Sequence, residues 1–138
     1  MIHPYILTYL IALVIFVVGD LLWLGYIAPA LYRSHIGHLM ADTVKWKAAI
    51  LFYLVFLLGL LIFVLIPSLE ARSFVRAIVY GGFFGFVTYA TYDLTNWAVL
   101  RGWGATITFI DILWGTLLVA LVSGVTYLVV STYVVPTP

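Results

Sequence analysis

The chain contains no cysteine among its 138 residues, and only 8% of its residues are charged. Without cysteine there is no disulfide framework, no thiolate nucleophile and no zinc or iron–sulfur site built on cysteine ligands. An ordinary soluble domain carries about 25% charged residues, so the composition does not fit a soluble globule. The net charge is +1 without basic or acidic runs, which gives no electrostatic basis for binding nucleic acid.

Hydrophobic residues are abundant instead, at 66% of the chain. A helix needs about 20 mainly apolar residues to cross a bilayer. Four segments satisfy this requirement, at about 5–26, 46–66, 74–100 and 105–130, and prolines and charges such as Pro29 and Pro67 separate them. We therefore predict one all-α membrane domain, an antiparallel bundle of four transmembrane helices with both termini on the same side.

Basic residues are distributed unevenly between the two sides of this predicted bundle. One side holds four in its connections and the other holds two, namely Arg33, Lys45, Lys47 and Arg101 against Arg72 and Arg76. Because cytoplasmic connections carry the excess of Lys and Arg, the side with four is expected to be cytoplasmic. Both termini are then expected outside.

Four polar residues fall at one depth of the predicted bundle. Counted from the cytoplasmic ends of their spans, Asp20 and Asp111 lie six residues inside, and Tyr53 and Asp93 lie seven. At 1.5 Å of rise per residue, all four are roughly 9 to 10 Å below the same interface. Since neighbouring helices run in opposite directions, this coincidence predicts one polar site to which every helix contributes.

Aromatic and amide side chains accompany the acids at helical spacing. Trp23 follows Asp20 by three residues, Trp114 follows Asp111 by three, and Asn96 and Trp97 follow Asp93 by three and four, so each set shares a helix face. "GDLLWLG" and "IDILWGT" look alike, but a leucine-rich helix repeats such patterns by chance. The predicted ligand-binding residues are Trp23, Tyr53, Tyr89, Asn96, Trp97 and Trp114.

The three intramembrane acids are the candidates for chemistry. An ionised carboxylate in the middle of a span costs about 2.5 to 3.5 kcal/mol, so such residues face the bundle interior and suggest function. Clustering and burial both favour the neutral form, and we expect at least one of Asp20, Asp93 and Asp111 to carry a proton near neutral pH. The structural alternative is that the acids only hydrogen-bond helices together, at about 0.6 kcal/mol per contact.

Two further patterns have simpler explanations. His35, His38 and Asp42 have a spacing that could hold a metal, but interfacial histidines solvated by headgroups explain the pattern better. We therefore predict no metal and no cofactor. Gly81 and Gly85 are four residues apart, which permits close helix packing.

The motifs together resemble a known family. "GDLLWLG", "LYRSHIGHL", "LFYL", "TYDLTN" followed by "LRGW", and "IDILWGT" are similar to those of the bacterial family of small inner-membrane proteins catalogued as domain of unknown function 2177. The resemblance implies a four-span protein of the bacterial inner membrane, so that the outside termini would be periplasmic. It implies no catalytic residues. Some members are encoded near enzymes that modify fatty acyl chains, which implies lipid chemistry.

Three functions remain open. The favoured one is a site that binds, and in an enzyme would modify by acid–base chemistry, an apolar or amphiphilic lipid-like molecule. A second is a proton-coupled or cation-coupled transporter, which four helices could form only as an oligomer. A third is an accessory subunit of a larger membrane complex. The expected partners are membrane lipids or an apolar small molecule, with a homo-oligomer as a further option.

Overall fold

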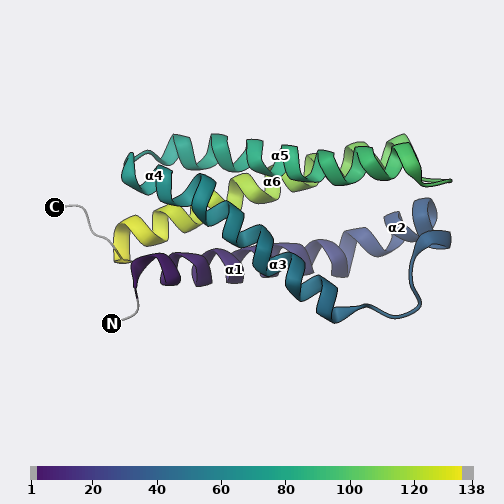
Figure 1. Cartoon of the computed structure of the whole chain (residues 1–138), viewed down its shortest axis with the longest axis horizontal. Helices are drawn as coiled ribbons and strands as arrows, with labels where there is room; N and C mark the ends of the chain where they lie inside the picture. The colour runs from purple at the N-terminus through teal and green to yellow at the C-terminus, as the bar shows by residue number, and fades with distance from the viewer. Residues whose placement is uncertain (1–2, 135–138) are drawn as a thin grey trace.

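Helices make up nearly all of residues 3–134, the part of the chain that the computed structural model describes. Four helical runs are long and apolar enough to cross a membrane, at Pro4–Leu39, Trp46–Glu70, Phe74–Val99 and Ala105–Val134. This confirms the predicted all-α membrane class with four transmembrane helices. Figure 1 shows successive runs passing along the bundle in alternating directions, with the start of the first and the end of the last at the same end.

The first run is longer than predicted because Pro29 does not end it. Helix α1 (Pro4–Leu22) continues through the π-helical segment η1 (Trp23–Ile27) into α2 (Ala28–Ile36) and a short 3-10 turn, η2 (Gly37–Leu39). A proline inside a regular α-helix clashes with the carbonyl four residues before it. Here the Ala28 N–H bonds to the Trp23 carbonyl, five residues back, so the turn is wider and admits the proline.

The second run accommodates Pro67 in the same way. Helix α3 (Trp46–Leu60) passes through the π-helical segment η3 (Leu61–Leu65) into α4 (Ile66–Glu70), and the Ile66 N–H bonds to the Leu61 carbonyl. Both prolines therefore stand two positions after a π-helical segment. The sequence signal that suggested helix ends marks wide turns within helices instead.

The last two runs form the most closely packed pair. Helix α5 (Phe74–Val99) packs along α6 (Ala105–Val129), which continues into the π-helical segment η4 (Val130–Val134). A Cβ at Gly85 would overlap the Gly115 carbonyl oxygen, and one at Gly81 would overlap the Ser123 side chain. The two glycines therefore allow the close helix contact that their spacing predicts.

Helix α3 is the most loosely attached wall of the bundle. Its second half supplies Phe56, Leu57 and Leu60 to the apolar core. Along its first ten residues, 46–55, only Ala49 and Tyr53 are half-buried, and all the others are exposed. Figure 1 shows α3 crossing the other helices obliquely. The side of the bundle near the start of α3 is therefore thinly covered.

Candidate functional site

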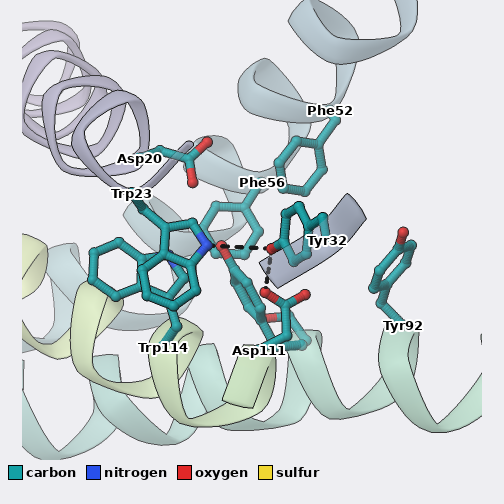
Figure 2. Close-up of a pocket in the computed structure, with 10 residues that line it drawn as sticks. Asp20, Trp23, Tyr32, Phe52, Phe56, Tyr92, Asp111 and Trp114 are labelled. Carbon is teal, nitrogen blue, oxygen red and sulfur yellow. Dashed lines mark hydrogen bonds between the residues drawn. The ribbon is translucent and has the colours of Figure 1, made fainter. Parts of the chain in front are cut away.

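A cavity of about 340 Å³ lies between the helical runs. Its ten lining residues come from α1, η1, α2, α3, α5 and α6, and are Asp20, Trp23, Tyr32, Phe52, Phe56, Thr88, Tyr89, Tyr92, Asp111 and Trp114. Seven of the ten are aromatic, and two are carboxylic acids. Figure 2 shows most of these side chains converging on one space from several helices.

One wall of the cavity is a pair of stacked indoles. The rings of Trp23 and Trp114 are nearly parallel, with an interplanar angle of 9° and centroids 4.4 Å apart. Trp23 follows Asp20 on the first run, Trp114 follows Asp111 on the last, and these two runs pass in opposite directions. The stack thus joins the two Asp-x-x-Trp motifs face to face.

A chain of hydrogen bonds links the first run to α6. The indole Nε1 of Trp23 donates to the Tyr32 hydroxyl at 3.2 Å, and that hydroxyl donates to Asp111 Oδ1 at 2.6 Å. Figure 2 draws both bonds with Tyr32 between the indole and the carboxylate. Through Tyr32, the indole of one motif therefore orients the acid of the other.

The second acid of the cavity is held from α3. The Tyr53 hydroxyl donates to Asp20 Oδ2. Asp20 also lies beside the indole of Trp114, whose buried Nε1 makes no well-formed hydrogen bond with any described residue. Each acid thus accepts a hydrogen bond from a neutral phenol. Asp20 lies near Trp114, the indole of the second Asp-x-x-Trp motif, and Asp111 is linked through Tyr32 to Trp23, the indole of the first.

Asp93 lies behind the cavity wall. Its carboxyl group is fully buried, and neither oxygen has a hydrogen-bond donor among residues 3–134. It interacts with Asp111 across the interface of α5 and α6. A proton shared between the two carboxyl groups would satisfy both. The third acid is therefore coupled to the cavity through Asp111 and does not line it.

The cavity is open on one side. Phe52 is 48% exposed and Tyr92 57% exposed, although both line it, whereas Phe56 is buried. Figure 2 places Phe52 and Tyr92 on the side away from the indole pair. Phe52 on α3 and Tyr92 on α5 therefore border the open side of the cavity.

The sequence-predicted residues fall into three groups. Five line the cavity, namely Asp20, Trp23, Tyr89, Asp111 and Trp114, while Tyr53 and Asp93 contact its acids. Asn96 and Trp97 do not line it, and Trp97 is 43% exposed and packs edge-on against Phe109. They miss the cavity because the last turn of α5 is exposed on nearly all sides.

Tyr32 is the main residue that the sequence did not reveal. It is nine positions from Trp23, which is 2.5 turns of a regular α-helix and would put the two side chains on opposite faces. A π-helical turn takes up one extra residue. The effective separation is then eight residues, which brings Tyr32 to within about a quarter turn of Trp23. Phe52, Phe56, Thr88 and Tyr92 also line the cavity without having been predicted.

The histidines take no part in this site. His35 Nδ1 hydrogen-bonds within its own helix, and His38 Nε2 lies 3.4 Å from the Arg101 carbonyl oxygen. Within the described chain, no three His, Cys, Asp or Glu side chains come together as metal ligands. The acids and aromatic rings around the cavity are therefore the candidate functional groups.

Comparison with known proteins adds a family but no activity. The family model described as "Predicted membrane protein (DUF2177)" matches residues 5–128, nearly the whole chain. Neither the curated proteins nor the solved structures include a match. The cavity is therefore the feature of this chain that bears on its function.

Proposed function

We propose that this chain, which belongs to the family of predicted membrane proteins called DUF2177, binds an apolar or amphiphilic molecule in the cavity between its helices. The cavity itself carries the proposal. At about 340 Å³ it falls within the range of roughly 300 to 1,000 Å³ that is usual for small-molecule sites. Its lining is also of the usual kind, mainly aromatic with a few polar groups that fix orientation.

The position of the opening supports a ligand that arrives from the bilayer. Phe52 and Tyr92 flank it on exposed faces of α3 and α5, which are candidate membrane spans. An apolar chain leaving the cavity there would pass directly into lipid. Asp20 and Asp111 would then hold the polar end of the molecule inside.

The same arrangement is suited to acid–base chemistry. A pair of carboxyl groups in one site can divide the roles, with a protonated one donating and an ionised one accepting. Asp20 and Asp111 are the two acids that reach the cavity, and Asp93 can exchange a proton with Asp111. If the bound molecule is transformed, these three residues are the proposed acid–base groups.

A cavity-filling variant tests binding. Thr88 lines the cavity and its hydroxyl bonds to the Phe84 carbonyl, while Thr91, on the same helix, is exposed and bonds to the Val87 carbonyl. Thr88→Phe should exclude a ligand that Thr91→Phe retains. Native mass spectrometry of the protein purified from its own membrane would measure retention. Equal retention by both variants, or bulk phospholipid alone on the wild type, would refute binding in the cavity.

We also propose that the chain lies in the bacterial inner membrane with both termini in the periplasm. The excess of Lys and Arg in the connections at the opposite end supports this orientation. Because the chain has no cysteine, Lys45→Cys would carry the only thiol. A membrane-impermeant thiol reagent should label it in inverted vesicles and not in intact cells. The reverse pattern would invert the topology.

A further inference from the structure

The charge of the cavity is unbalanced. Of its ten lining residues, all within the described chain, two are carboxylic acids and none is Lys, Arg or His. Acids inside a membrane are normally paired with a cation or with one another. Among residues 3–134, the well-formed hydrogen bonds to Asp20 and Asp111 come from the neutral phenols of Tyr53 and Tyr32. A positive group is the complement that this cavity lacks.

Asp93 is an independent sign of the same imbalance. It is fully buried, it has no donor among the residues described, and it interacts with Asp111 at the cavity wall. Asp93 is thus a third acid, beside Asp111, next to a cavity whose lining supplies no positive charge. A cation bound beside Asp111 would favour the ionised form of this acid pair, which the protein alone does not stabilise with a positive charge.

The aromatic lining fits a cation as well. Aromatic ring faces attract ammonium groups, and several such rings around one space form the usual site for quaternary ammonium ligands. Here Trp23, Tyr32, Tyr89, Tyr92 and Trp114 line the cavity together with the two acids. A metal ion is a poorer fit, because the space is far larger than a bare ion and the described residues offer no group of three ligands.

We infer that the molecule bound in the cavity is a cationic amphiphile, whose ammonium group lies between Asp20 and Asp111 among the aromatic rings and whose apolar chain leaves between Phe52 and Tyr92. This inference rests on the proposed binding function and specifies its ligand class. The acids supply charge, the rings supply cation–π contacts, and the opening supplies the path for the chain.

A set of probes with one chain length tests the head group. Decyltrimethylammonium, decylamine, decanol and decanoate are titrated into the protein in a neutral detergent, and binding is measured by native mass spectrometry. Partition of each probe into micelles is the same for every variant, so differences between variants report the cavity. We expect one ammonium probe per chain, bound at least about tenfold more tightly than decanol or decanoate.

Three variants test which residues cause the preference for the ammonium probes. Asp20→Asn with Asp111→Asn should reduce ammonium binding to the level of decanol. Asp42→Asn, the same change at an exposed acid outside the cavity, should leave it unaltered. Tyr92→Leu removes an aromatic face at the exposed opening and should weaken ammonium binding several-fold without changing decanol binding. Because Tyr92 is largely exposed, this variant tests the inference even if the double variant does not fold.

The outcomes separate this inference from the proposed function. The inference of a cationic ligand is overturned if decanol or decanoate binds as tightly as the ammonium probes or more tightly. It is also overturned if ammonium binding survives the double Asn change. In both cases the proposal of binding in the cavity stands. If no probe binds the wild type, or if Thr88→Phe changes none of them, both proposals fail.

Discussion

The indole rings of Trp23 and Trp114 stack 4.4 Å apart between the first and last helical runs. Two indoles held so close and so nearly parallel couple electronically, which should give a paired signal in the ultraviolet circular dichroism. Trp114→Phe should abolish that signal. Trp97→Phe, which alters an exposed indole, should preserve it. A signal that survives Trp114→Phe would show that the stack does not form in solution.

The bond between Tyr53 and Asp20 should be measurable as a coupling free energy. Tyr53→Phe leaves a buried carboxyl group without its donor, which we expect to cost about 1 to 3 kcal/mol of stability. If the two side chains act through this bond, Tyr53→Phe should cost much less in an Asp20→Asn background. Unfolding in mixed micelles gives the stability of the wild type, the two single variants and the double variant. Additive effects would contradict the contact.

The approach of α5 to α6 predicts a sharp difference between two glycines. A Cβ at Gly115 would overlap the Tyr89 ring, while one at Gly25 would meet nothing within 4 Å. Gly115→Ala should therefore destabilise the protein by about 1 to 3 kcal/mol and disturb the cavity wall. Gly25→Ala should be close to neutral in the same thermal unfolding assay. Similar melting temperatures for the two variants would contradict this packing.

The wide turn before Pro29 should matter to the cavity, and the one before Pro67 should not. Pro29→Ala removes the ring that a regular helix cannot admit. A return to regular α-helix would rotate Tyr32 by about 100°, away from Asp111. We expect Pro29→Ala to weaken ligand retention and Pro67→Ala to preserve it. Unchanged retention in Pro29→Ala would mean that the contacts of Tyr32 hold the turn without the proline.

A transport function for the same acids would need further titratable groups along the bundle. Outside the acid layer, the fully buried polar side chains among residues 3–134 are hydroxyls, namely Thr8, Ser68, Thr108, Ser123 and Thr126. They offer no titratable group to carry a proton across the rest of the bundle. We therefore expect sealed proteoliposomes to show no flux of protons or cations above that of empty vesicles. Flux that disappears with Asp20→Asn would favour transport over binding.

Hydropathy and depth predicted much of the arrangement. The four apolar segments become four helical runs. Counting residues from their ends places four polar residues at one level, where the structure pairs Tyr53 with Asp20 and Asp93 with Asp111. This worked because rise per residue is nearly constant in a helix, so depth can be read from sequence.

Helix phase was harder to predict than depth. Tyr32 was missed because the π-helical segment shifts its face, and such segments leave no periodic signal of their own. Trp97 shares a face with Asp93, yet it is 43% exposed and packs edge-on against Phe109 of α6, outside the cavity. Periodicity indicates which residues share a face of a helix. What that face contacts depends on how the other helices pack against it.

The sparse packing of the first half of α3 gives the Tyr53 bond a second role. Along residues 46–55 it is the one bond between two side chains that joins α3 to α1 among the described contacts, beside the bond from the Tyr9 hydroxyl to the Leu54 carbonyl. Phe52, the preceding residue, borders the cavity. A ligand that displaces the Tyr53 hydroxyl from Asp20 would remove this bond. Filling the cavity and releasing this part of α3 are then thermodynamically linked, so the entrance would be loosest when the site is occupied.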